Sequence, residues 1–130
     1  MDAHFTIDVD PERDLVRIAM DGFFNLADID RFLEARAEAH KALTCAPNAH
    51  LTINDLRGMK IQSKDSVARF GALLAGPEYR SRRLAFVVGP TLARGQLARL
   101  ITHRTARCFD TPAIAEAWLF DESGQVSDAA

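Results

Sequence analysis

The chain has 130 residues, of which 48% are hydrophobic and 26% charged, and these values are typical of one soluble globular domain. Its formal net charge of -2 provides no overall attraction to nucleic acid or to a membrane surface. The longest apolar runs are far too short for a transmembrane helix, and the chain begins without a basic or apolar signal segment. We therefore expect a cytoplasmic protein with no transmembrane segment and no nucleic-acid partner.

The residues that usually carry catalysis or bind metals show no recognisable spacing. Cys45 and Cys108 are far apart in the sequence, and the four histidines do not form a zinc pattern. The chain contains no Gly-x-Ser-x-Gly elbow, phosphate loop or dinucleotide-binding glycine pattern. We expect packed thiols, no metal, no cofactor, no catalytic residue and no enzymatic activity.

The first 24 residues predict a β-hairpin. Apolar and polar residues alternate over residues 5–9, and a second apolar strand covers residues 15–20, with a polar turn between them. Two strands joined by a short turn most simply pair antiparallel. Phe23 and Phe24 follow and are expected to fold over the core.

A helix and a short buried strand are predicted next. Asn25 is a good N-cap for a helix whose apolar residues recur at helical spacing, and Pro47 ends this unit. The apolar residues Leu51, Ile53 and Leu56 indicate a short buried strand. Asn54, Asp55 and Gly58 signal a turn at its end.

The second half of the chain alternates helices and strands. Residues 63–66 begin a helix that Gly76 closes, and residues 84–88 form the most continuously apolar run, which suits an interior strand. Residues 89–91 cap a long helix, and residues 108–109 form a short edge strand.

The last predicted helix begins at residues 110–112, and its apolar side consists of Ile114, Ala117, Trp118 and Leu119. Residues 121–130 turn small and polar, so we expect a flexible tail after a single domain over residues 1–120. The element order predicts an α/β domain with a mixed sheet of about four to five strands and helices packed on it.

Two stretches carry a family resemblance: the strand at residues 83–89 with the Arg-bearing helix behind it, and the segment Cys-Phe-Asp-Thr-Pro-Ala-Ile-Ala-Glu-Ala-Trp-Leu at residues 108–119. With this element order, the chain resembles small bacterial members of the STAS-like (SpoIIAA-like) family. The resemblance implies that family's α/β fold, with either binding of small molecules, lipids or nucleotides, or docking on partner proteins.

One motif of the anti-sigma-factor antagonists in this superfamily is only partly present. In those proteins an Asp-Leu-x-Gly turn leads to an Asp-Ser-Ser-Gly helix start that carries a phosphorylated serine. This chain has Asp55-Leu56-Arg57-Gly58, but Ser63-Lys64-Asp65-Ser66 follows and Lys64 occupies the phosphorylatable position. The resemblance therefore does not transfer a kinase-controlled serine to this chain.

The crossover from strand to helix is the first candidate site, because function in α/β sheets usually lies where strands end and helices begin. Its candidate residues are Asp55, Arg57, Gly58, Ser63 and Ser66. The serines are candidates for phosphorylation or anion binding, although plain helix capping is the favoured interpretation. Asp55 is either an acid near a ligand or, more often in such positions, an acceptor for the amides of its own turn.

A basic stripe is the second candidate site. Arg99, His103 and Arg107 are spaced four apart, which places them on one side of a helix. Together with the arginines of residues 80–83 they are candidates for binding a phosphate-bearing ligand or an acidic partner. A solvated helix surface is the usual alternative.

These patterns lead to two hypotheses for function. The first is a non-catalytic regulatory or protein-interaction module, with a two-fold homodimer as one way to cover exposed strand edges. The alternative is a carrier or sensor that binds a small apolar or anionic ligand, such as a lipid or nucleotide, between the helices and the sheet. Core packing is the favoured interpretation of the aromatic residues, whereas under the carrier hypothesis a subset of them lines a hydrophobic pocket. These residues are Phe23, Phe24, Phe70, Phe86 and Trp118.

Overall fold

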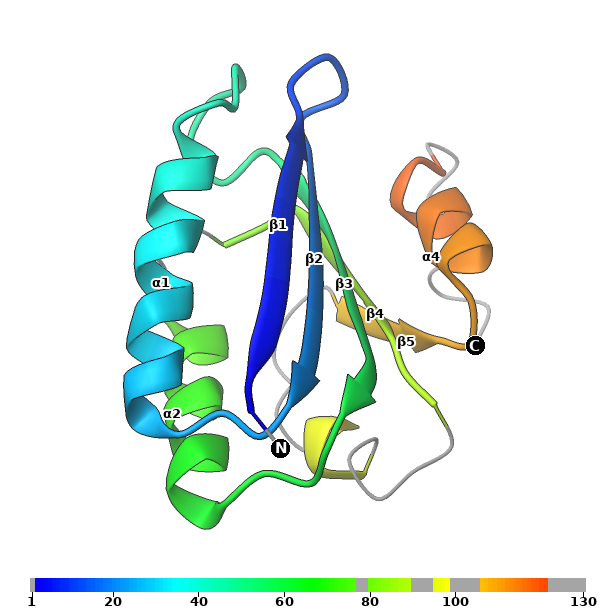
Figure 1. The fold of residues 1–130 in the computed structure, drawn as a ribbon. Helices are drawn as coiled ribbons and strands as arrows, with labels where there is room; N and C mark the ends of the chain where they lie inside the picture. Colours follow the sequence, from blue (N-terminus) through cyan, green and yellow to red (C-terminus); the bar gives the residue numbers. More distant parts are fainter. Residues whose placement is uncertain (1, 77–79, 90–94, 99–105, 122–130) are drawn as a thin grey trace.

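The computed structural model describes residues 2–76, 80–89, 95–98 and 106–121. Within them, five strands form a mixed sheet in the order β1-β2-β3-β4-β5. Helices cover both faces of this sheet, with α1 and α2 on one side and α4 on the other (Figure 1). The predicted α/β class and mixed sheet are confirmed.

The N-terminal hairpin forms as predicted, with β1 (His4–Asp10) antiparallel to β2 (Leu15–Gly22). The remaining strands run parallel to β2: β3 (Leu51–Met59), β4 (Arg83–Val87) and β5 (Ala106–Phe109). β4 lies between β3 and β5, which explains why its sequence is apolar on both faces.

The described helices begin where capping residues stand in the sequence. Asn25 and Asp28 form a reciprocal capping box at the start of α1 (Leu26–His40). Ser63 accepts from the Ser66 amide at the start of α2 (Lys64–Ala75), and Thr111 caps α4 (Pro112–Leu119). Residues 95–98 are helical as well. The rest of the predicted long helix and the tail beyond residue 121 lie outside the described residues.

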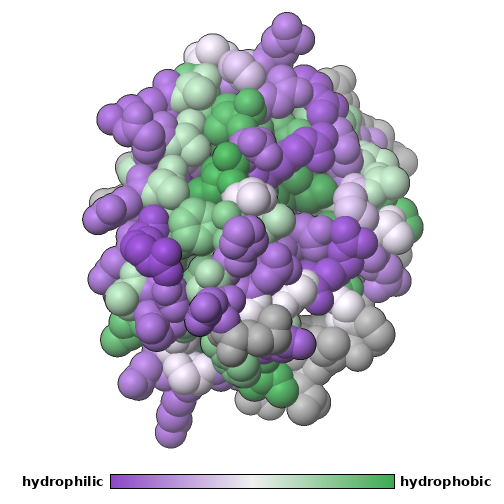
Figure 2. Space-filling model, in the orientation of Figure 1, coloured by the Kyte–Doolittle hydropathy of each residue, from purple (hydrophilic) through white to green (hydrophobic). Residues whose placement is uncertain are grey.

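Side chains alternate between the two faces of the sheet and create two separate apolar layers. The layer under α4 contains Trp118 and Leu119 of the helix packed on Leu51, Ile53 and Val87. The layer under α1 and α2 contains the apolar side chains of β1 and β2 packed on buried residues of α1. Figure 2 shows the molecule from the side of Figure 1, with hydrophobic side chains gathered over the strands and hydrophilic ones around them.

Three local predictions were wrong. The turn predicted at Asn54, Asp55 and Gly58 is part of β3, which continues to pair with β2 through a register shift. Phe24 is buried as expected, but Phe23 is 47% exposed and does not fold over the core. In α4, Trp118 and Leu119 are buried as predicted, but Ile114 and Ala117 are exposed and Ala115 is in the core instead.

The cysteines and the helix lengths match two further expectations. Cys45 and Cys108 are both thiols and are partly buried. Among the described residues, no helix is long and apolar enough to cross a membrane.

Candidate functional site

A cavity of about 140 Å³ lies between the sheet and the helices α1 and α2, with the helical turn at residues 95–98 beside it. Most of its wall is apolar and comes from three strands, both helices and this turn. The apolar lining residues are Ile18, Met20, Phe32, Leu56, Met59, Val67, Phe70, Leu73, Leu74, Leu84, Phe86, Val88 and Leu97. Of the aromatic residues proposed from the sequence, Phe70 and Phe86 line it, while Trp118 packs in the opposite layer.

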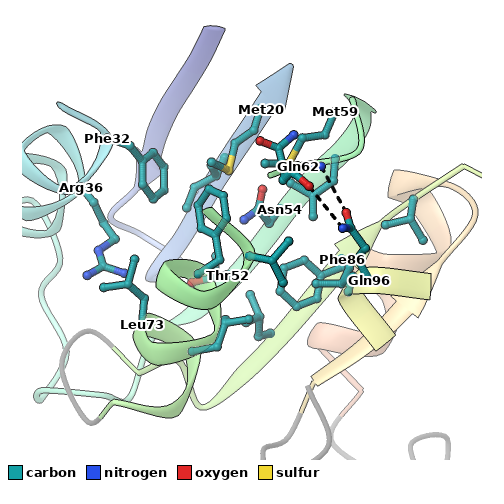
Figure 3. A pocket seen from close by; sticks show the side chains of 18 of the residues that line it. Met20, Phe32, Arg36, Thr52, Asn54, Met59, Gln62, Leu73, Phe86 and Gln96 are labelled. Carbon is teal, nitrogen blue, oxygen red and sulfur yellow. Dashed lines mark hydrogen bonds between the residues drawn. The ribbon is translucent and has the colours of Figure 1, made fainter. Parts of the chain in front are cut away.

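Polar side chains divide this cavity into two ends and a middle (Figure 3). Arg36, His40, Thr52 and Ser81 lie where β3 and β4 begin, and Lys60, Gln62 and Gln96 lie beyond the carboxyl end of β3. Asn54 lies between the two ends, on the face of β3 that it shares with Thr52.

A chain of hydrogen bonds connects the polar groups at the first end. The Oγ1 of Thr52 and the Oγ of Ser81 lie 2.6 Å apart, and the Oγ of Ser81 lies 3.3 Å from the Nε2 of His50. The Nε2 of His50 is in turn 3.3 Å from the Nε2 of His40. Thr52, Ser81 and His50 are buried, so this end of the cavity is a desolvated polar network.

The carbonyl oxygen of Arg36 fixes the hydrogen-bonding state of His40. The Nδ1 of His40 lies 2.8 Å from this oxygen, so Nδ1 carries a hydrogen and donates it. Burial lowers the pKa of His40 despite this hydrogen bond, and the positive charge of Arg36 lowers it further. In neutral His40 the Nε2 is therefore an acceptor, and His50 is the donor between the two rings.

The middle of the cavity contains an unsatisfied acceptor. The Oδ1 of Asn54 is buried and accepts no hydrogen bond from any residue that the structure describes. A buried acceptor without a donor costs about 1–3 kcal/mol relative to a satisfied one. A bound molecule with a donor group, or an ordered water, would remove this cost.

Two glutamines join the elements at the second end. The backbone amide of Gln62 donates to the side-chain Oε1 of Gln96 at 3.2 Å. The side-chain Nε2 of Gln96 donates to the backbone carbonyl oxygen of Gln62 at 3.4 Å. The Oε1 of Gln62 also accepts from the Phe24 amide at 2.8 Å. This end of the cavity is thus bounded by contacts between the loop after β3 and the helical turn at residues 95–98 (Figure 3).

The predicted crossover residues are not among the residues that line the cavity. On β3, the guanidinium of Arg57 forms a two-pronged ion pair with Asp55, with nitrogen–oxygen distances of 3.0 and 2.7 Å. Its side-chain hydrogen bonds hold the pKa of Asp55 below the ordinary value. Asp55 also accepts from the Arg57 amide, which agrees with the local-acceptor interpretation. Gly58 leaves room for the carboxylate of Asp21, which would lie 1.8 Å from a Cβ at this position.

The two candidate serines have different environments. Ser63 is exposed and caps α2, as the capping interpretation expects. Ser66 is only 1% exposed, and its hydroxyl donates to the carbonyl oxygen of Phe24. A kinase therefore has access to Ser63 but not to Ser66 in this fold.

The structure describes only part of the predicted basic stripe. Arg107 belongs to β5, which pairs with β4, so its predicted place on a helix was wrong. Arg99 and His103 lie outside the described residues. The guanidinium of Arg83 turns toward α4, where its Nη1 donates to the carbonyl oxygens of Trp118 and Asp121 at 2.6 and 2.9 Å.

The polar residues of the cavity were missed by sequence reasoning because they belong to separate elements. The helical pattern places Arg36 on a solvated face, and Ser81 stands within a polar, basic loop sequence. Thr52 and Asn54 did carry a signal, because polar residues two apart in a buried strand point to the same face. Assigning Asn54 to a turn concealed this signal.

Comparisons with known proteins agree with this architecture. No protein-family model matches the chain, and no curated protein matches it in sequence. The fold is SpoIIAA-like. A similar solved structure is an uncharacterized protein of the DUF3478 family from Shewanella loihica PV-4, which has a SpoIIAA-like fold. The two share 15% sequence identity with a TM-score of 0.66, over 92% of this chain and 96% of that one.

Proposed function

We propose that this domain is a carrier or sensor that binds a small, largely apolar ligand in the cavity between the sheet and the helices α1 and α2. The observation that carries the proposal is the cavity of about 140 Å³, whose wall is apolar except for a few polar groups. An engineered apolar cavity of about 150 Å³ is large enough to bind benzene. A ligand of one ring or a short hydrocarbon chain therefore matches this space.

The unsatisfied Oδ1 of Asn54 supports the proposal independently of the volume. Ligand sites are typically apolar with a small number of placed polar groups that orient the bound molecule. Asn54 meets this description. A hydrophobic side chain at the same position of β3 would avoid the cost of an unsatisfied acceptor, so the presence of Asn54 favours a role in orienting a ligand.

We infer binding rather than catalysis in this cavity. The Ser81 hydroxyl is close to His50, but it also shares a short hydrogen bond with Thr52 and is largely buried. A nucleophile needs access to its substrate and a base that can take its proton. This arrangement favours a structural or ligand-orienting network.

An NMR titration with 1-octanol tests the proposal, with backbone amides observed in ¹H–¹⁵N spectra. We expect saturable shifts at Asn54, Leu73 and Phe86, which line the cavity from three elements. Leu73→Phe should reduce these shifts by filling the space. Ala72→Phe adds the same ring at an exposed position of α2 and should leave them unchanged. Shifts that avoid the cavity, or that are equal in both variants, would contradict the proposal.

A protein-interaction module is the second candidate, and an exposed apolar cluster favours it. Phe23, Leu26 and Ile61 are all close to half exposed. Phe23 precedes α1, Leu26 is its first residue, and Ile61 lies in the loop after β3. The Lys60 amide donates to the Gly22 carbonyl oxygen at 3.2 Å and holds these two segments together. Ser63 follows directly after the second loop. Exposed apolar clusters of this kind often mark contacts with other proteins.

Sedimentation equilibrium tests the simplest form of this candidate, in which the cluster pairs with a second copy of the chain. Wild-type protein should then self-associate, and a variant with Phe23→Ser, Leu26→Ser and Ile61→Ser should be monomeric. Ile114→Ser removes an exposed apolar side chain from a different surface and serves as the matched control. Monomeric wild-type protein at high concentration would remove the self-pairing form.

A further inference from the structure

We propose that the ligand of this cavity is a small monoanion with an apolar body, such as a short-chain or single-ring carboxylic acid, whose carboxylate lies against Arg36. This inference rests on the proposed function, because it specifies the ligand of the same cavity. It selects one class from the apolar, anionic, lipid and nucleotide ligands that the sequence left open.

The first argument is the charge of the cavity wall. Among the described lining residues, Arg36 and Lys60 are cationic and His40 can become so, whereas no aspartate or glutamate is present. The whole chain has a net charge of -2, so the positive charge of the cavity lining is opposite in sign to the net charge of the chain. An apolar surrounding strengthens the attraction between a cation and a bound anion.

The second argument is the arrangement at the Arg36 end. The Nε atom of Arg36 is buried, and the hydroxyls of Thr52 and Ser81 share this end of the cavity. Guanidinium groups bind carboxylates through two parallel hydrogen bonds, and hydroxyls can donate to the same oxygens.

The third argument is that the Lys60 end of the cavity is a weaker site for an anion than the Arg36 end. Lys60 is exposed to solvent, and its neighbours Gln62 and Gln96 already bond to each other. A solvated lysine contributes little binding energy because water screens its charge. The anionic group should therefore lie at the Arg36 end, with the apolar body extending toward Leu73 and Phe86.

The size and charge of the cavity argue against a nucleotide. A volume of about 140 Å³ suits one ring or a short chain, and the Arg36 end provides one guanidinium, of which the Nε atom is buried. A nucleotide carries a base, a sugar and phosphate with more than one negative charge, and it needs a larger set of donors.

Isothermal titration calorimetry with a matched set of probes tests the inference: octanoate, 1-octanol and octylamine share one chain length and differ in charge. At neutral pH octanoate should bind the wild-type protein at least about tenfold more tightly than 1-octanol, since hydrogen bonds to charged groups are the stronger ones. Octylamine should bind most weakly. If 1-octanol or octylamine binds as well as octanoate, the anionic ligand is ruled out while the proposed cavity function stands.

Two substitutions locate the carboxylate. Arg36→Gln should weaken octanoate about tenfold, by loss of the charged hydrogen bonds, and leave 1-octanol nearly unchanged. Arg36→Lys should restore part of the loss. Arg69→Gln is the matched control, because Arg69 pairs with Asp30 at 2.8 Å on the outer side of α1 and α2. Unchanged binding of 1-octanol shows that each variant retains a folded cavity.

The remaining outcomes are also decisive. If Lys60→Gln rather than Arg36→Gln weakens octanoate, the carboxylate lies at the other end and the assignment to Arg36 is wrong. If Arg36→Gln and Arg69→Gln have equal effects, the preference for octanoate is a general surface effect and the inference fails. If none of the three probes binds the wild-type protein, the proposed function fails together with it.

Discussion

The Nε2 atoms of His40 and His50 lie 3.3 Å apart, and their rings meet edge to face at 88°. Because the Nδ1 of His40 donates to the carbonyl oxygen of Arg36, one hydrogen between the two Nε2 atoms satisfies both rings in their neutral forms. The pair connects the last turn of α1 to the start of β3, so its protonation is coupled to the packing of α1 on the sheet.

Acidification should destabilise the fold through His40. Burial and the nearby Arg36 lower the pKa of this residue in the folded state, so the unfolded chain binds a proton more readily. The stabilisation is therefore present above the ordinary pKa of histidine, near 6.5, and is lost as pH falls through the lower folded-state value. Urea unfolding at several pH values between about 5 and 8 should show stability rising with pH over this range.

His40→Gln provides the control for this prediction. The substitution removes the titrating group and retains a polar side chain that can face His50. The free energy of unfolding should then vary less with pH than in the wild-type protein. An unchanged pH dependence would show that His40 is not the group responsible.

Ser66 should be a structural residue rather than a phosphorylation site. Ser66→Ala leaves the carbonyl oxygen of Phe24 without its donor and should cost about 1–3 kcal/mol of stability. Ser66→Asp places a charge in a site that is 1% exposed and should cost more. Ser63→Asp keeps an effective helix cap and should be nearly neutral. Equal stability of the two Asp variants in urea unfolding would contradict this assignment.

Arg83 should stabilise the packing of α4. Its Nη1 donates to two carbonyl oxygens near the end of this helix, and its guanidinium lies 5.4 Å from the centre of the Trp118 ring. Arg83→Met should cost about 1–3 kcal/mol by loss of these charged hydrogen bonds. Arg82→Met, at the exposed neighbouring position, should have little effect. A similar loss in both variants would indicate a general charge effect instead.

Glu116 should contribute a small, pH-dependent stabilisation. Its Oε1 accepts from Arg13 and Arg17 at 2.7 and 2.9 Å, and the side-chain hydrogen bond from Arg13 is the main cause of its lowered pKa. This stabilisation is present above the ordinary glutamate value of 4.5 and is lost as pH falls through the lower folded-state pKa. Because these groups are substantially exposed, Glu116→Gln should cost no more than about 1 kcal/mol at pH 7. An equal cost at pH 3 would contradict the ion-pair explanation.

The fold could be predicted from the sequence because its elements carry strong local signals. Alternation in β1, the apolar run of β4 and the capping residues Asn25 and Ser63 each specify one element, and the order of elements restricts the topology. The errors occurred where tertiary packing decides the outcome. Pairing with β2 extends β3 through residues that usually form turns, and pairing with β4 places Arg107 in a strand.

The candidate site could not be assembled from the sequence, because it depends on contacts between distant residues. His40, Thr52 and Ser81 belong to three different segments and meet only when α1 packs on the starts of β3 and β4. The spacing of residues within one helix or strand contains no information about contacts between residues of different elements. The general location between helices and sheet could be anticipated as one alternative, whereas the polar residues that define it could not.

The measurement that tests the central claim most directly is an isotope-filtered NOE experiment on methyl-labelled protein with bound octanoate. Transfer from the octanoate chain to the methyl groups of Met20, Leu73 and Leu84 is predicted, because all three line the cavity. Transfer confined to Leu26 and Ile61, in the exposed apolar cluster, would place the ligand on the surface and contradict the account.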